Sequence, residues 1–163
     1  MITNEDIVSI SQNILSTMLK LEAIPCVPLP SEKRIDRITG CIQISGEWKG
    51  AIILQSSEEL ARTFASRLLD ENPAKISEED LRDAFAEMTN MIGGNIKGQV
   101  PCPSFLSIPS VTTGQDFDFH LAGATVIRDL ALECDGEILR IVMCEENRTQ
   151  PSLSAQRKLD TAK

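Results

Sequence analysis

The chain has 163 residues, a length that suits one domain and can form a core without disulfide or metal staples. Hydrophobic residues make up 42% and charged residues 25%, close to the averages for a soluble globular domain. The formal net charge of −8 argues against a nucleic-acid partner and against acidic membranes, because binding to either depends on clustered Lys and Arg.

No apolar run is long enough for a membrane helix, and the first six residues carry two acids and no base. We therefore expect a cytoplasmic protein without a membrane partner. Because His120 is the only histidine, a Cys/His zinc site is not expected on this chain. Five cysteines form no Cys-x-x-Cys pair, and several lie in apolar runs, as buried free thiols do in a reducing compartment. They are Cys26, Cys41, Cys102, Cys134 and Cys144.

The first predicted element is a helix over residues 4–21, with Thr3 or Asn4 as its cap. Apolar residues recur there at intervals of three and four, which predicts one buried stripe. The stripe consists of Ile7, Ile10, Ile14, Met18 and Leu21.

Prolines at positions 25, 28 and 30 exclude helix from the next segment, so we expect an extended or looped chain up to Ser31. Apolar and polar residues then alternate over 35–45, which is typical of a half-buried strand. A turn at Gly46-Glu47 leads into a second strand over 48–55.

Two helices follow these strands. Ser56 to Glu59 reads as a capping box, in which a hydroxyl and a carboxylate each satisfy a free amide at a helix start. The second helix should begin after a Ser77 cap, with Asp80 at the box position, and run from about residue 78 into the Gly-Gly pair at 93–94. Ile76 can pack against Leu81 across its first turn.

The remainder of the chain has strand-like sequence at 105–112 and 117–134, and Asp135-Gly136 predicts a hairpin turn into 138–144. The order of elements predicts an α+β fold: an antiparallel or mixed sheet of about five to six strands with three helices packed on it. We expect a single domain over 1–146, followed by a polar, mobile tail at 147–163.

The helix after Ser77 has two distinct faces. With about 3.6 residues per turn, Asp83, Glu87 and Asn90 lie on one arc and should point into solvent. A polar stripe of this kind is also found on any ordinary surface helix. The glycines at 93–94 replace the helix formers expected there, and they would let a partner backbone come close. The opposite face, which should pack on the sheet, consists of Leu81, Phe85, Met88 and Ile92.

The pattern Asp83-x-x-x-Glu87-x-x-Asn90, followed by Gly-Gly-Asn at 93–95, resembles the signature of the CheC, CheX and FliY chemotaxis phosphatases. The local match is specific, and the predicted order of elements extends it over most of the chain. The implied fold is therefore CheC/CheX-like.

Two details refine the resemblance. Members of the CheC type carry a second copy of the motif near the start, whereas here Asn13 is preceded by Ile10 where that copy would have Glu. A single copy is similar to the CheX branch. The family pattern also places a proline about two dozen residues after the asparagine, where this chain has Thr113, with Pro109 earlier.

The resemblance implies a phosphatase that acts on the aspartyl phosphate of a CheY-type response regulator. The regulator would supply the Mg²⁺ ion and a lysine, so no cofactor is implied on this chain. Asn90 would position the attacking water, since an amide can both accept and donate. Glu87 would accept a hydrogen bond from the lysine, and Gly94 would contact the partner. Asp83 would either contact the partner as well or only keep the helix soluble. A homodimer is implied as well.

Two other classes of function remain open. The first is a non-catalytic, dimeric CheX-like module that binds a response regulator or a flagellar switch component. The second is a thiol-based redox or sensory protein, although the sequence offers no cysteine pair at a helix start that would lower a thiol pKa.

Overall fold

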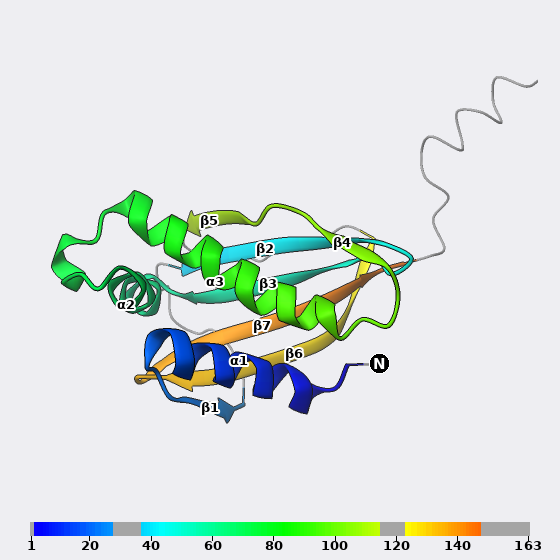
Figure 1. Cartoon of the computed structure of the whole chain (residues 1–163), viewed down its shortest axis with the longest axis horizontal. Coiled ribbons are helices and arrows are strands. Elements are labelled where there is room, and N and C mark those ends of the chain that lie inside the picture. Colours follow the sequence, from blue (N-terminus) through cyan, green and yellow to red (C-terminus); the bar gives the residue numbers. More distant parts are fainter. Residues whose placement is uncertain (1, 28–36, 115–122, 148–163) are drawn as a thin grey trace, which may run out of the picture.

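The computed structural model describes residues 2–27, 37–114 and 123–147 (Figure 1). The predicted tail lies outside these ranges except for Asn147, and so does His120. The elements in chain order are α1 (Asn4–Leu19), β1 (Ala23–Cys26), β2 (Arg37–Gly46), β3 (Gly50–Ser57), α2 (Glu58–Leu69), a 3-10 turn (Pro73–Lys75), α3 (Glu78–Gly98), β4 (Ser104–Leu106), β5 (Ser110–Gly114), β6 (Ala124–Cys134) and β7 (Glu137–Glu146).

The strands of these ranges form one antiparallel sheet in the order β1-β6-β7-β3-β2-β4, with β5 also paired to β2. Figure 1 shows the three helices on one face of this sheet, with α3 crossing obliquely over β2 and β3. The α+β fold is thereby confirmed. The sheet has seven strands in the described ranges, where the sequence predicted five to six.

Both additional strands involve prolines. β1 lies in the segment expected to be extended or looped. Pro25 is accommodated because, among the strands of the described residues, β1 is at the edge of the sheet and pairs with β6 alone. The single strand predicted at 105–112 is wrong. It is two short strands, β4 and β5, because Pro109 cannot donate to a ladder and the chain leaves the sheet around it.

The predicted turns and caps are confirmed with one exception. Asp135 and Gly136 have φ of 52° and 80°, as the two central residues of a type I′ hairpin require. The capping box predicted over Ser56 to Glu59 is wrong: the cap is Ser57, and the third helical residue, Leu60, has no carboxylate to complete a box. Ser56 belongs to β3, and the hydroxyl of Ser57 accepts the amide of Leu60 at 3.1 Å.

The core lies between the helices and the sheet. The predicted buried face of α3 is confirmed, since all four of its side chains are fully buried, and Phe85 stacks on Phe64 of α2 with ring centroids 6.3 Å apart. The predicted stripe of α1 is partly wrong: Met18 is 52% exposed, because the helix turns Leu15 and Leu19 toward the sheet and ends before Leu21. The buried residues of α1 are Ile7, Ser11, Ile14, Leu15 and Leu19.

A second, smaller apolar cluster lies on the side of β2, β3 and β7 away from the main core. It contains two of the three buried cysteines, Cys41 and Cys144; the third, Cys134, belongs to the main core. Cys26 and Cys102 are half-buried. None of the described helices is long and apolar enough to cross a membrane.

Candidate functional site

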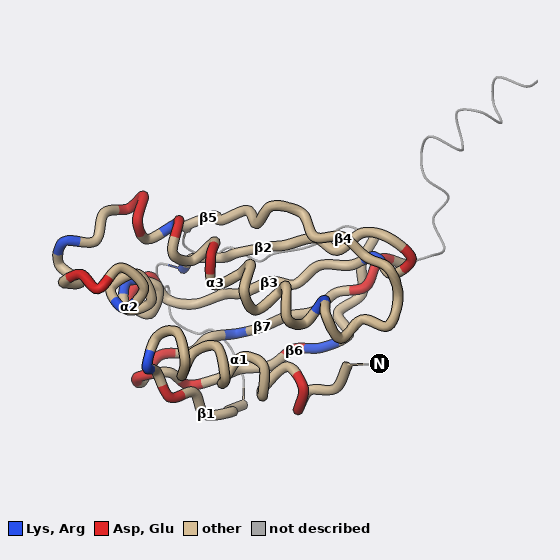
Figure 2. Tube along the Cα trace, viewed as in Figure 1, with Lys and Arg blue, Asp and Glu red and all other residues tan. Residues whose placement is uncertain are grey.

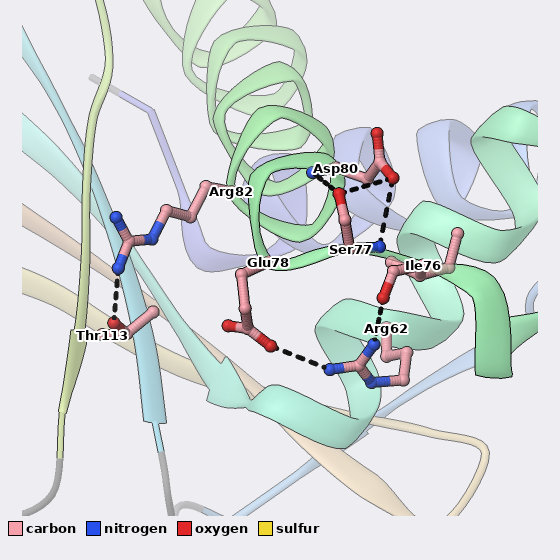
Figure 3. A network of polar contacts seen from close by, with 7 residues as sticks. All are labelled: Arg62, Ile76, Ser77, Glu78, Asp80, Arg82 and Thr113. Atoms are coloured by element: carbon pink, nitrogen blue, oxygen red, sulfur yellow. Dashed lines mark hydrogen bonds and ion pairs between the residues drawn. The ribbon is translucent and has the colours of Figure 1, made fainter.

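The start of α3 is fixed by the predicted capping box, which Figure 3 shows in detail. The hydroxyl of Ser77 donates to the Asp80 carboxylate at 2.7 Å and accepts from the Asp80 amide at 3.0 Å. The Ser77 amide donates back to the same carboxylate at 3.1 Å. These hydrogen bonds hold the pKa of Asp80 below its usual value, since they favour the charged form.

Two arginines tie the first turns of α3 to neighbouring elements (Figure 3). The guanidinium of Arg62, on α2, donates to the carbonyl of Ile76 at 2.7 Å and to the carboxylate of Glu78 at 3.3 Å. Arg82 donates to the hydroxyl of Thr113, on β5, at 3.3 Å. The helix is thus connected on one side to α2 and on the other to the edge of the sheet.

Two glycines allow α3 to approach β2 closely beneath the candidate residues. A β-carbon on Gly40 of β2 would collide with the Thr89 hydroxyl, and one on Gly93 would lie 2.6 Å from Cγ2 of Ile42. The Thr89 hydroxyl donates to the carbonyl of Phe85 at 2.7 Å, so it is satisfied within the helix. The segment 85–93 is therefore packed tightly on the sheet, which makes it a rigid platform.

The polar residues predicted on the other face of α3 point away from the sheet. Asp83, Glu87 and Asn90 are exposed, and Gly94 follows one turn after Asn90 on the same stripe. In the part of the chain that the structure describes, no hydrogen bond or ion pair engages the side chains of Asp83, Glu87 or Asn90. All three are available to a partner molecule.

These side chains form one wall of an open groove with a volume of about 430 Å³. The opposite wall is the loop between β4 and β5, which contributes Ser107, Ile108 and Pro109. Ile108 is 90% exposed. The complete lining is Asp83, Ala86, Glu87, Asn90, Ser107, Ile108 and Pro109.

The loop wall was not predicted from the sequence. Its three residues fell inside the strand expected at 105–112, and Pro109 was the available signal, because a proline inside a strand pattern marks an edge or a break. The structure also separates the two positions considered for the family's proline. Pro109 lines the groove, whereas Thr113 lies on β5 and accepts from Arg82.

The charge of the site is negative. Figure 2 shows acidic residues concentrated on the first half of α3, and Asp83 and Glu87 bring two carboxylates to the groove. Such a wall suits a cationic group, while the Asn90 amide can accept from one group and donate to another. In residues 2–27, 37–114 and 123–147, no three His, Cys, Asp or Glu side chains gather as metal ligands would.

The buried cysteines are not activated thiols. Burial raises the pKa of Cys41 to about 11 and that of Cys134 to about 12. Thiols with raised pKa values are poor nucleophiles at neutral pH, because the thiolate is the reactive form. This environment gives no support to the thiol-based alternative.

Comparison with known proteins agrees with the fold and with the family that the motif resembles. The family model described as "Chemotaxis phosphatase CheX" matches residues 38–127, which is more than half of the chain and includes the whole of α3. No curated protein sequence matches significantly.

Several solved structures share the fold. The chemotaxis protein CheX from Vibrio vulnificus is 24% identical, with a TM-score of 0.72 over 88% of this chain and 95% of that chain. A CheC-like chemotactic protein from Shewanella oneidensis is 27% identical, with a TM-score of 0.66 over 88% of this chain and 97% of that chain. A chain of the CheX-CheY-BeF3-Mg²⁺ complex from Borrelia burgdorferi is 20% identical, with a TM-score of 0.66 over 88% and 97%.

Proposed function

The chain belongs to the family of the chemotaxis phosphatase CheX, and we propose that it hydrolyses the aspartyl phosphate of a CheY-type response regulator, ending a chemotaxis signal. The observation that carries this proposal is the presentation of Glu87 and Asn90. Both are exposed, point into one groove, and stand on a helix that is held rigidly against the sheet. The Borrelia neighbour, whose complex contains CheY, supports a partner of this class.

Asn90 has the role of positioning water in this proposal. An acyl phosphate hydrolyses slowly while the attacking water is disordered, and holding that water in line with the breaking P–O bond removes much of the barrier. The Asn90 carbonyl accepts a hydrogen bond from the water, and its NH₂ group donates to a phosphate oxygen. Because a carboxamide does not titrate, Asn90 itself introduces no pH dependence.

Glu87 has the role of docking. Its carboxylate lies one turn before Asn90 in the same groove and accepts a charge-assisted hydrogen bond from the regulator's lysine. This bond sets the register in which Asn90 meets the phosphorus. Asp83 adds a second carboxylate to the same wall of the groove. Gly94 lies on the same stripe of α3, and because it has no side chain it leaves room for the partner's backbone.

We assign the metal ion of the reaction to the regulator. Mg²⁺ bound in the regulator's own pocket neutralises charge on the phosphoryl group. The residues contributed by this chain position a water and a lysine, and neither task requires a metal on this side of the interface. The negative charge of the chain does not favour approach to an acidic pocket, so we expect transient binding led by shape.

We also propose that the protein acts as a cytoplasmic homodimer, as the family resemblance implies. One edge of β6 pairs with β7. Along its other edge, and within the described ranges, β1 pairs with residues 131–134, while residues 124–130 have no strand beside them. An uncovered strand edge can pair with a second chain. A measurement of mass in solution tests the dimer.

The decisive experiment follows the decay of a phosphorylated CheY-type receiver domain with and without this protein. We expect the wild type to accelerate decay and Asn90→Ala to lose about 100-fold of that acceleration, the scale of a lost positioning contact. Asn13→Ala is the matched control, because Asn13 is exposed on α1 and lies outside the groove.

The outcome separates the proposal from the non-catalytic alternative. If the wild type and Asn90→Ala leave the decay rate equally unchanged, the hydrolase assignment is wrong. Binding of the receiver domain without any acceleration would then favour the dimeric binding module.

A further inference from the structure

We propose that Ile108 recognises the protein substrate of this site: it packs against the aliphatic stem of the lysine that Glu87 binds. The inference rests on the proposed function and deepens it. It assigns the groove's second wall, the β4–β5 loop, to recognition of an amphipathic cationic side chain on the regulator's surface.

The exposure of Ile108 is the first observation. Scattered surface hydrophobic residues are ordinary, and exposure alone would carry nothing. Ile108, however, is 90% exposed and lines the same groove as Glu87 and Asn90. An apolar side chain at the edge of a reaction site gains free energy only when a partner covers it.

The second observation is that the loop is built to hold Ile108 in this place. The amide of Ser107 donates to the carbonyl of Gln43 at 2.9 Å, and the amide of Gln43 donates to the Ser107 hydroxyl at 2.9 Å. That hydroxyl donates in turn to the carbonyl of Ile108 at 2.9 Å. Pro109 restricts the next φ angle. A preorganised loop loses little conformational entropy when a partner binds.

The third observation is the contrast between the two walls. Asp83 and Glu87 make one wall acidic, whereas Ala86, Ile108 and Pro109 are apolar. Lysine matches both, because its methylene groups can lie along an apolar surface while the ammonium group reaches a carboxylate. A free acyl phosphate matches neither wall, because it has no ammonium group and no extended apolar part.

The test compares Ile108→Ser with Phe105→Ser, which makes a like change at an apolar residue that is 71% exposed on β4 and lies outside the groove. Two quantities are measured: kcat and KM for the phosphorylated receiver domain, and Kd for the receiver domain bound to BeF₃⁻ and Mg²⁺. We expect Ile108→Ser to raise KM and Kd about tenfold with kcat unchanged, the scale of one buried aliphatic side chain. Phe105→Ser should leave all three within about twofold of the wild type.

Two further arms sharpen the result. Ile108→Met should have KM and Kd values close to those of the wild type, because methionine is an apolar side chain that can adapt to the lysine stem. Ile108→Ser should leave any hydrolysis of acetyl phosphate unchanged, because that substrate has no lysine stem for Ile108 to cover. Thermal unfolding of each variant is the control for folding. We expect unchanged stability, because the substituted positions are exposed.

The proposal is overturned if Ile108→Ser leaves KM and Kd unchanged, if it lowers kcat instead, or if it slows hydrolysis of acetyl phosphate to the same extent. The binding arm keeps these outcomes separate from the proposed function. If the wild type does not hydrolyse the regulator at all, the phosphatase assignment fails, and a tenfold change in Kd still supports Ile108 as the docking residue.

Discussion

Gly93 of α3 lies directly over Ile42 of β2, so closely that a β-carbon on the glycine would be 2.6 Å from Cγ2 of the isoleucine. The next residue, Gly94, has a different environment. A β-carbon there would meet only Cδ1 of Leu106, at an ordinary 3.7 Å. The first glycine therefore serves the packing of the helix on the sheet, and only the second is free for contact with a partner.

This contrast predicts opposite effects for two alanine substitutions. Gly93→Ala should lower the free energy of unfolding by about 1–2 kcal/mol, because Ile42 is β-branched and overpacking costs more than the gain in helix propensity. Gly94→Ala should raise it by up to about 1 kcal/mol. Urea unfolding measures both. Equal stabilisation by the two would contradict the packing argument.

Gly94→Ala should also weaken regulator binding even though it stabilises the fold, because a methyl group then stands on the surface that the partner approaches. A several-fold rise in KM with the phosphorylated receiver domain is the expected result. An unchanged KM would remove Gly94 from the partner-binding surface and leave it as an ordinary helix glycine.

Glu87→Gln tests the docking bond. Replacing a charged acceptor by a neutral one should cost about 1–2 kcal/mol of docking, that is, roughly a tenfold rise in KM, with a smaller loss of rate. The difference should shrink at high salt. Glu59→Gln, the same change at an exposed position on α2, is the control and should behave as wild type. A similar effect of both substitutions would indicate nonspecific electrostatics.

Acid should destabilise the protein through its helix caps. The pKa of Asp80 is held below 3.8 by hydrogen bonds from Ser77, so its contribution to stability is present above the unfolded-state pKa and is lost as the pH falls through the lower folded-state pKa. Hydrogen bonds from Thr3 likewise lower the pKa of Asp6, in the cap of α1, so its contribution to stability is lost in acid in the same way. Between pH 7 and about pH 3, the free energy of unfolding should fall less in Asp80→Asn than in the wild type. Equal losses would show that the cap does not contribute.

The cysteines should be selectively protected in the native protein. Since burial raises the pKa of Cys41 to about 11 and that of Cys134 to about 12, neither should react with iodoacetamide at about pH 8 until the protein unfolds. Mass spectrometry of alkylated peptides from native and urea-unfolded protein measures the difference. Rapid native labelling of Cys41 would return the thiol-based class to consideration.

Much of α3 was predictable because the helical period acts over short distances. The repeat of Leu81, Phe85 and Met88 assigns one face to the core, and the opposite arc must then carry Glu87 and Asn90 outward. Caps and hairpin turns are equally local, which is why Ser77 and the Asp135-Gly136 turn were identified correctly. At α2 the cap is Ser57 and not Ser56, because two adjacent serines can each serve as a cap, and with Leu60 at the third helical position no box forms.

The amino-acid sequence by itself determined the α+β class, the two faces of α3, and the motif that identifies the family, since each depends on residues within a few turns of one another. Only the tertiary structure decided that Ile108 and Pro109 face Glu87 across a groove, and that Gly93 belongs to the fold while Gly94 remains accessible. Those relations follow from the pairing of β4 and β5 with β2 and from the close packing of α3 on that strand. Contacts between segments so far apart along the chain leave no periodic pattern, because they depend on how complete elements pack together.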